Sequence, residues 1–233
     1  YLQRARFLAI AEFGPRSLIY HEGRAYRVYK AKLPARAHVA DTGLLATTRR
    51  WVCDDCGAAH EEEPERCHVC GAAMGTVDAI NDILRIDNVE TAAAERITAN
   101  DEDRQRQGFE IQTVFAWPER DGVLDVSTAV ASDAEGAILR LDYASGATIS
   151  RINKGLRRRK EKSILGFEID PITGRWGKGS DEVASDMDPD IGGRTQRVVP
   201  FVQDNKNAIL LRLAAGPLPE TGMATLQHAL MRG

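Results

Sequence analysis

The sequence predicts an α+β protein that is mainly β. We expect an N-terminal hairpin unit, a cysteine-rich insertion, and a larger antiparallel or mixed C-terminal sheet with a terminal helix. Three observations support this class. Apolar and polar side chains alternate from Phe109 to Trp117, which is the period of a strand with one buried face. Short apolar runs follow, separated by turn residues. All four cysteines lie between Cys53 and Cys70, so they organise one local segment.

The N-terminal part is predicted to combine a short helix with a hairpin. Residues 2–12 are apolar with interspersed charges, and Gly14-Pro15 is a strong signal for the end of a helix. Residues 17–20 and 25–29 resemble strands and flank the turn sequence His21-Glu22-Gly23-Arg24, which indicates a hairpin. We also expect a strand over residues 43–52 and a capped helical turn over residues 100–107.

The C-terminal part is predicted to hold a series of strands and one helix. Turn residues separate the strands, because Gly, Asn and Asp adopt backbone conformations that other residues avoid. Met223, Leu226 and Leu230 share one face of a helix expected over residues 221–232, with Thr221 as its cap. Residues 177–193 are acidic and rich in Gly, Asp and Ser, and are expected to be a mobile loop. The further expected strands are 123–130, 137–142, 148–153, 163–170, 196–203 and 208–213, with turns at 121–122, 145–146, 173–174 and 204–205.

The composition is that of a globular protein. Of 233 residues, 43% are hydrophobic and 28% are charged, and the net charge is −3. No apolar run reaches the roughly 18 residues of a membrane-spanning helix, and no signal peptide is present, so we expect a cytoplasmic protein without a membrane partner. The chain begins at Tyr1 and ends within a helical pattern, so we expect a piece of a longer protein.

The four cysteines form two matched pairs. Cys53 and Cys56 are separated by two residues, as are Cys67 and Cys70, and a glycine follows each pair. Two cysteines at this spacing can direct both sulfurs at one ion when the backbone turns tightly, and glycine permits that turn. Two such knuckles predict a tetrahedral four-sulfur site, which suits structural Zn²⁺, with an iron centre as the competing interpretation. His60 and His68 are expected to be surface residues, and Arg49, Arg50 and Arg66 to offset the charge of the thiolates.

A run of basic residues is the second distinctive feature of the sequence. Residues 151–162 hold seven basic residues and one acid, whereas residues 181–190 hold five acids and no base. Lysine and arginine bind phosphates and release counterions, so the run is the best nucleic-acid candidate, and a solvated loop is the alternative. We expect it at a hairpin tip. The candidate nucleic-acid-binding residues are Arg151, Lys154, Arg157, Arg158, Arg159 and Lys160.

A catalytic centre is not evident. The phosphate-binding loop, the serine-hydrolase elbow and the zinc-protease helix motif are all missing from the sequence. Asp101, Asp103 and Glu110 are the residues that a magnesium-dependent nuclease would use, but no second acidic cluster accompanies them. Three tryptophans, Trp51, Trp117 and Trp176, are candidates for stacking on bases. Trp117 is expected to lie in the core, and Trp176 is expected to be the most exposed of the three.

Several phrases along the chain resemble one known family in the same order. Examples are Glu12-Phe13-Gly14-Pro15 and Gly174-Arg175-Trp176. With the two cysteine knuckles, the phrases lie at residues 12–15, 19–26, 101–110, 151–155, 166–170, 174–176 and 226–233. Together they resemble the four-cysteine domain near the C-terminus of large bacterial superfamily 2 helicases. Relatives include mitomycin-repair helicases and the helicase components of the DISARM phage-defence system, in which a partner protein carries the domain without a motor.

The resemblance implies a zinc-bearing accessory segment of an ATP-dependent DNA helicase or translocase, acting in antiviral defence or DNA repair. Its partners would be single-stranded or forked DNA and the helicase motor domains of the same or another chain. ATP and Mg²⁺ would bind only in the parent motor, outside this segment. The alternative is a protein-interaction scaffold, the motorless partner of a helicase, that does not bind nucleic acid. We expect residues 1–50 to form the helix and hairpin unit, 51–76 the zinc ribbon, and 77–233 the β-rich domain, incomplete at its C-terminus.

Overall fold

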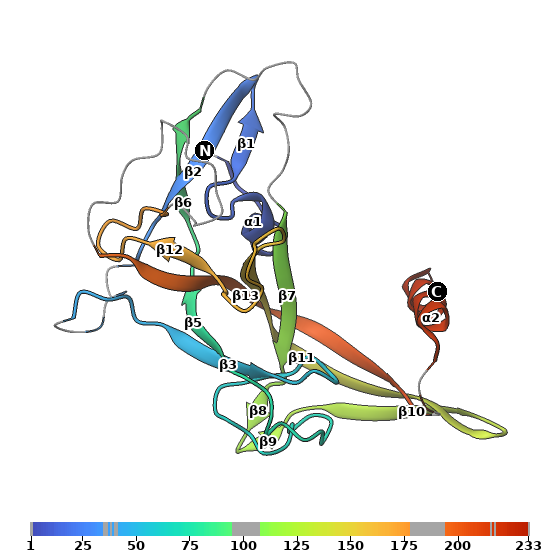
Figure 1. The fold of residues 1–233 in the computed structure, drawn as a ribbon. Helices are drawn as coiled ribbons and strands as arrows, with labels where there is room; N and C mark the ends of the chain where they lie inside the picture. Colours follow the sequence, from blue (N-terminus) through green and yellow to red (C-terminus); the bar gives the residue numbers. More distant parts are fainter. Residues whose placement is uncertain are drawn as a thin grey trace. The chain divides into compact units, whose positions relative to one another are not determined.

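The computed structural model describes residues 2–34, 37, 39, 42–94, 108–177, 194–214, 216 and 218–232 (Figure 1). It is mainly β, with a helix near each end of the described chain, which confirms the predicted fold class. The helical turn expected at 100–107 and most of the loop expected at 177–193 lie outside the described residues. No helix in the described ranges is long and apolar enough to cross a membrane. The chain forms two compact units, residues 1–116 with 149–204, and residues 117–148 with 205–233.

The first unit begins with the predicted helix and hairpin. Helix α1 spans Arg6–Glu12 and is followed by strands β1, Leu18–His21, and β2, Arg24–Ala31. Glu22 and Gly23 join the strands with φ angles of 48° and 72°, so both residues of the turn have positive φ. A two-residue turn of this kind matches the right-handed twist of its strands. Strand β6, Val89–Ala93, pairs with β2 on its other side and completes a three-stranded sheet.

The second sheet of this unit is mixed, as predicted. Strand β5, Ile80–Arg85, pairs antiparallel with β3, Thr48–Val52, and parallel with β13, Gln196–Leu213. The sequence did not predict β5 or β6, because Asn81 and Asp82 interrupt the apolar pattern of β5. The other strands are β4 (Ala59–His60), β7 (Phe109–Ala116), β11 (Gly136–Leu156) and β12 (Phe167–Ile169).

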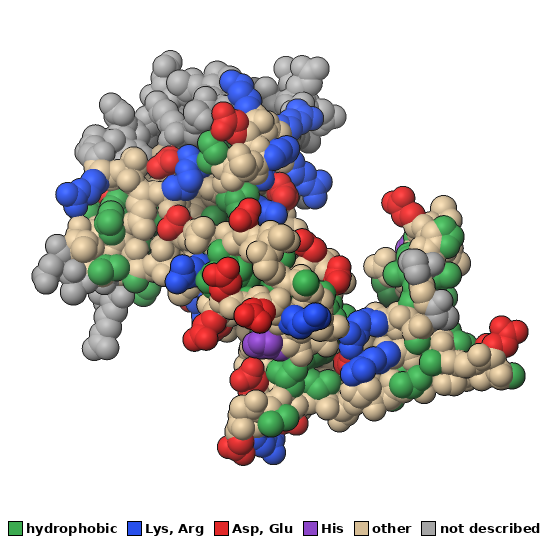
Figure 2. Space-filling view, turned by 60° about the horizontal axis from the view of Figure 1, so that its bottom comes forward, with side chains coloured by type: hydrophobic (Ala, Val, Ile, Leu, Met, Phe, Trp, Pro, Cys, Tyr) green, Lys and Arg blue, Asp and Glu red, His purple; other side chains and the backbone are tan. Residues whose placement is uncertain are grey.

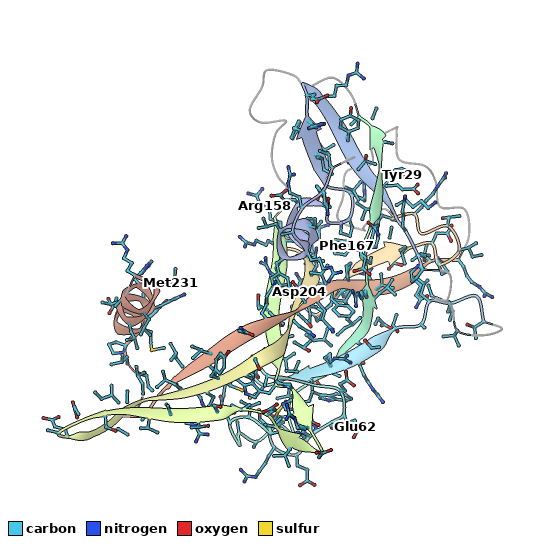
Figure 3. The ribbon with its side chains drawn as sticks, turned by 180° about the vertical axis from the view of Figure 1, so that it is seen from behind. Tyr29, Glu62, Arg158, Phe167, Asp204 and Met231 are labelled. Carbon is cyan, nitrogen blue, oxygen red and sulfur yellow. The ribbon has the colours of Figure 1, made fainter. Side chains whose placement is uncertain are left out.

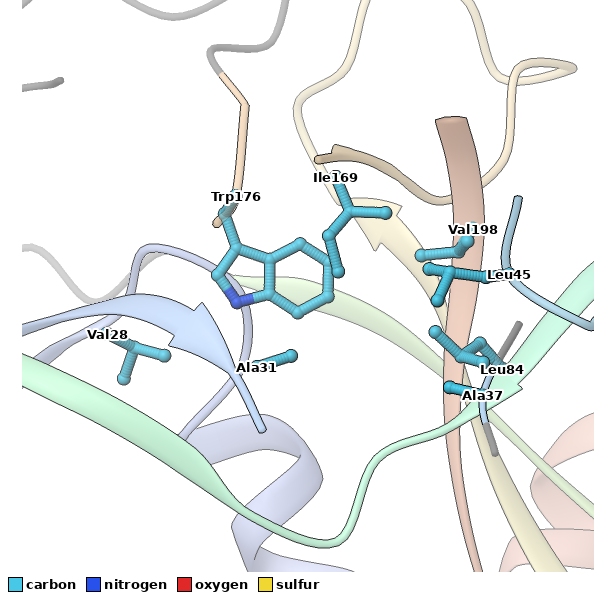
Figure 4. Close-up of a cluster of buried hydrophobic side chains, with 8 residues drawn as sticks. All are labelled: Val28, Ala31, Ala37, Leu45, Leu84, Ile169, Trp176 and Val198. Atoms are coloured by element: carbon cyan, nitrogen blue, oxygen red, sulfur yellow. The ribbon is translucent and has the colours of Figure 1, made fainter. Parts of the chain in front are cut away.

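One hydrophobic cluster joins the two sheets of the first unit. Its buried side chains are Val28, Ala31, Ala37, Leu45, Leu84, Ile169, Trp176 and Val198 (Figure 4). Trp176 was expected to be the most open tryptophan, but it is only 7% exposed, because its backbone forms a bridge with Ile169 and its ring packs in this cluster. The cluster combines residues from 1–50 with residues from 77–233, so the compact units do not follow the three ranges expected from the sequence.

The second unit contains a small hairpin, a long strand pair and the C-terminal helix. Asp121-Gly122 forms the predicted turn between β8, Glu119–Arg120, and β9, Val123–Leu124. Strand β10, Ser127–Asp133, pairs antiparallel with residues 136–143 of β11. The buried carboxylate of Asp142 accepts hydrogen bonds from Thr128, Arg140 and Arg212, so its charge is compensated. Helix α2, Glu220–Arg232, confirms the predicted terminal helix, and Thr221 lies within it instead of capping it.

Two predicted turns are wrong. Ser145-Gly146 and Asp204-Asn205 lie inside β11 and β13, which continue through them as single long strands. Gly146 has a φ of 82°, so it forms an irregularity within a strand without reversing the chain. Asn205 accepts a hydrogen bond from Thr148 on the neighbouring strand. These polar residues suggest a turn in the sequence, but in the structure they form an exposed part of a strand pair.

We predict that Gly166→Ala destabilises the first unit more than Gly23→Ala does. Both glycines have positive φ, 79° and 72°, which costs a residue with a side chain about 1–2 kcal/mol. A methyl group on Gly166 would also overlap the backbone carbonyl of Val198, whereas space is open beside Gly23. Thermal and denaturant unfolding of the two variants should differ by about 1 kcal/mol or more, the scale of a packing clash. Equal losses would contradict the close approach at Gly166.

Candidate metal centre and basic segment

The two cysteine knuckles have the same backbone structure. In the first, the N–H of Gly57 donates to the carbonyl of Cys53 at 2.8 Å, and the N–H of Cys53 donates to the carbonyl of Ala58 at 2.9 Å. In the second, Gly71, Cys67 and Ala72 repeat both bonds at 2.8 Å. Gly57 and Gly71 have φ angles of 77° and 79°, with nothing within contact distance of an added Cβ. The glycines are therefore needed for backbone conformation and not for space.

These knuckles bring the four sulfurs into one cluster. The Cys53 and Cys70 sulfurs are 3.6 Å apart, as are those of Cys56 and Cys67, and all four lie within 4.8 Å of one another. These separations are far longer than the roughly 2.05 Å of a disulfide bond. Four sulfurs placed tetrahedrally at about 2.3 Å from a zinc ion would be about 3.8 Å apart. The four predicted ligands therefore form a cluster that can hold a metal ion.

The environment of the cluster is largely apolar. Cys53 and Cys67 are each 2% exposed and pack with Trp51, Ala58 and Met74. Burial raises the pKa of Cys56 and of Cys67. Burial also acts to raise the pKa of Cys70, but the N–H of Ala72 and the neighbouring thiols outweigh it and lower that pKa. Because burial disfavours negative charge, full ionisation of the cluster requires a cation at its centre.

The residues around the cysteines differ partly from expectation. His68 is exposed as predicted, but His60 is only 8% exposed, because it lies in β4 opposite Trp51 and its ring meets that of His68 at 5.1 Å. Burial lowers the pKa of His60, and the charge of His68 acts in the same direction. Arg66 donates to the carbonyl of Gly71 at 3.0 Å, so it supports the second knuckle directly. Arg50 pairs with Glu61, and Arg49 lies over the Trp51 ring.

The surface of the cysteine segment is acidic. Residues 53–74 contain six carboxylates and, among lysine and arginine, only Arg66. All six are exposed, and acidic side chains surround a histidine on the face shown in Figure 2; the six are Asp54, Asp55, Glu61, Glu62, Glu63 and Glu65. Four thiolates around a divalent ion would add further negative charge. This segment would therefore repel phosphate, a feature that a count of charges within the ribbon could have revealed from the sequence.

The basic segment lies at the end of β11, and much of its charge is used within the protein. Arg159 is 9% exposed at its side chain, pairs with Glu110 at 2.7 Å, and donates to the carbonyls of Leu156 and Lys162. Lys154 also pairs with Glu110, at 3.6 Å, and the pKa of Glu110 is lowered by these two cations against the opposing effect of burial. These contacts hold the segment against β7.

Two further arginines of the segment also bind backbone carbonyls. Arg151 donates to the carbonyl of Phe7 in α1, and Arg157 donates to that of Phe109 at 2.9 Å. The expected hairpin tip is not observed, because β11 leads to β12, and both strands pair with β13 instead of with each other. The side chains of Arg157, Arg158 and Lys160 face solvent, and Arg158 is labelled in Figure 3. Arg151, Lys154 and Arg159 are thus used mainly within the protein, Arg158 and Lys160 are exposed, and Arg157 is exposed while also bonding to Phe109.

The other sequence candidates are not assembled into a site. Trp51, Trp117 and Trp176 are all buried, at 6–7% exposure, so their rings are not available to stack on bases. Glu110 is engaged by Arg159 and Lys154, and Asp101 and Asp103 lie outside the described residues. Glu110 is thus committed to cations of the protein and is not a free ligand for magnesium.

We predict that Cys56→Ser reduces bound metal from one equivalent to a small fraction, because three sulfurs hold a soft ion much more weakly than four. The neighbouring substitution Asp55→Ser is the matched control, since Asp55 is exposed and contributes no ligand to the cluster. Elemental analysis of both variants, purified without chelator, measures the effect. Full metal content in Cys56→Ser would show that the cluster is not the binding site.

We also predict that metal binding releases protons. The raised pKa values of Cys56 and Cys67 keep these thiols protonated near neutral pH in the metal-free chain, and each must lose its proton to bind. Metal affinity should therefore rise with pH and fall on acidification. Calorimetric titration in two buffers of different ionisation enthalpy measures the released protons. Binding enthalpies that do not depend on the buffer would contradict this expectation.

Comparisons with protein-family models, with curated proteins and with solved structures found no match to this chain. The likeness to the helicase-associated four-cysteine domain therefore remains an expectation carried by the sequence phrases that suggested it.

Proposed function

We propose that this chain is a zinc-bearing accessory segment of a larger ATP-dependent DNA helicase or translocase. The four-cysteine cluster has a structural role, and the exposed part of the basic segment, Arg157, Arg158 and Lys160, contacts DNA. The observation that carries the proposal is the closed sulfur cluster. Four protein ligands leave no open position for water or substrate, so the metal organises the fold and performs no chemistry.

Zinc is the ion that best fits the cluster. Thiolate ligands select soft or borderline ions, and a tetrahedral set of four suits Zn²⁺ or a single iron. Zinc has no preference for geometry of its own, so it accepts the arrangement that two independent knuckles impose. A structural zinc site contributes about 10–16 kcal/mol of binding free energy in small peptides, which is enough to order a segment with few large apolar residues.

DNA contact is supported by the basic segment and by the resemblance to helicase-associated domains. Arg158 has an exposed side chain, and Arg157 keeps the end of its guanidinium available while its Nε binds Phe109. Arg159 and Lys154 do not need to touch DNA to contribute, because they fix the backbone on which the exposed cations are carried. The pathway, antiviral defence or DNA repair, follows from the resemblance alone, as does the motor partner, whereas the cytoplasmic location is proposed from the sequence features described above.

A scaffold without nucleic-acid binding is the second candidate. It is favoured by the acidic surface of the cysteine segment and by the internal use of Arg151, Lys154 and Arg159. In this case the basic segment only holds neighbouring elements of the fold together. The zinc ribbon then presents an acidic face to a basic protein partner, such as the motor domains of a helicase.

The decisive experiment is a charge reversal confined to exposed side chains. If the first proposal holds, Arg158→Glu/Lys160→Glu weakens binding of a labelled single-stranded DNA. The slope of log affinity against log salt concentration should also become less steep by about 0.7 for each phosphate contact that is lost. Arg24→Glu/Arg232→Glu changes the net charge equally at exposed residues of β2 and α2 and is the matched control. Arg159 is left unchanged, because its reversal would place a carboxylate beside Glu110.

Each outcome separates the two candidates. Salt-sensitive binding that only the first double variant loses supports DNA contact. Equal loss in both variants assigns binding to overall charge and not to this segment. If the protein without substitutions does not bind DNA even at low salt, the result supports the scaffold function. Iron in place of zinc, by elemental analysis, would overturn the metal assignment in either case.

A further inference from the structure

The first unit contains a cavity to which the proposed DNA contact assigns no role. It has a volume of about 540 Å³ and lies among α1, the β1–β2 hairpin, the connection from β5 to β6, and Trp176. Its walls are part apolar and part polar, with Ile10, Phe13, Ile19 and Val89 on the apolar part. Small-molecule sites in proteins have this size and character, with a few polar groups that fix the orientation of the ligand.

One buried polar group of this cavity lacks a partner. The indole Nε1 of Trp176 is inaccessible to solvent and makes no hydrogen bond among the described residues, although Trp176 lines the cavity and is 7% exposed. Figure 4 shows this nitrogen on the side of the ring nearer Val28 and Ala31, so the ring must turn for a ligand in the cavity to accept this hydrogen bond. Buried tryptophan N–H groups usually find an acceptor, because an unsatisfied donor costs the free energy of its lost hydration.

The charges that line the cavity favour an anion. Arg4, Arg6 and Lys32 line it, against the single carboxylate of Asp87, which is itself bound by Arg85 at 3.2 Å. The carboxylates that pair with the three cations, Glu12, Asp204 and Glu90, do not line the cavity. These ion pairs are largely exposed, so they are weak and the cations can turn to a ligand.

We propose that this cavity binds a small amphiphilic anion. Its apolar or aromatic body fills the space between α1 and Trp176 and carries an acceptor atom for the indole N–H. Its carboxylate, phosphate or sulfonate group meets Arg4, Arg6 and Lys32. This assignment satisfies the buried donor, the apolar walls and the excess of positive charge with one ligand.

The test uses 7-methoxycoumarin-4-acetic acid and its methyl ester, two fluorescent probes with the same ring system, of which only the acid is charged at neutral pH. Both carry a ring carbonyl that can accept the indole hydrogen bond. The acid should bind about tenfold more tightly than the ester at low salt, and salt should reduce the difference because it screens the cations. In proton–nitrogen correlation spectra the Trp176 indole signal, assigned by its absence in Trp176→Phe, should move on binding while those of Trp51 and Trp117 stay in place.

Variants locate the binding to this cavity. Trp176→Phe keeps the ring packing and should weaken both probes by roughly two- to tenfold, the range expected for one hydrogen bond. Arg4→Gln/Arg6→Gln should remove most of the preference for the acid and leave the ester unaffected. Ala9→Leu places a larger side chain in the cavity and should block both probes, whereas Ala11→Leu, in the same helix but outside the lining, should not.

Three results would overturn the proposal. The first is equal affinity for acid and ester at low salt. The second is binding that survives Ala9→Leu unchanged, since the probes would then lie elsewhere. The third is a Trp176 indole signal that does not respond to saturating acid, or the absence of binding by either probe at millimolar concentration.

Discussion

Four cysteine sulfurs that lie within 4.8 Å of one another, and can hold one metal ion, constrain the path of the chain from β3 to β5. The first knuckle follows directly from Val52 at the end of β3, and the chain returns from the second knuckle through Met74 to Ile80 at the start of β5. Because β3 and β5 pair with each other, and β5 pairs with β13, the sulfur cluster fixes the turn on which the mixed sheet of the first unit is built. Residues 53–74 contribute few large apolar side chains, so a metal ion bound by the four sulfurs would replace the stabilisation that a hydrophobic core gives elsewhere.

Negative and positive charge lie on different segments of the first unit. The cysteine segment carries six exposed carboxylates, which favour positively charged groups and repel phosphate. Positive charge is concentrated at the end of β11, where Glu110 holds Arg159 and Lys154 in place and leaves Arg158 exposed. A charge run in a sequence therefore has to be divided into cations that build the fold and cations that face solvent before it is assigned to a ligand.

Local features of the sequence predicted local structure well. The four cysteines, the hairpin turn at Glu22-Gly23 and the alternating strand from Phe109 needed only spacing and conformational preference, and all are present. Features that depend on distant residues were missed. Strand β5 has a weak pattern and exists because β3 and β13 flank it. The exposure of Trp176 depends on an antiparallel bridge to Ile169, and the internal use of Arg159 depends on Glu110, far away along the chain. Spacing carries no information about such partners.

The parallel pairing of β5 with β13 has a consequence for biosynthesis. All four cysteines have been made once residue 70 has left the ribosome, whereas the strand that pairs with β5 in parallel begins only at Gln196, after residues 117–148 of the second unit. During that interval Ile83 and Leu84 lack the partner that buries them, and non-local pairings of this kind form slowly. A metal ion bound by the proposed zinc site would hold β3 beside β5 during this interval. If the proposed metal site is correct, metal deprivation would first cause aggregation of unfinished chains during translation, before mature protein lost a bound ion.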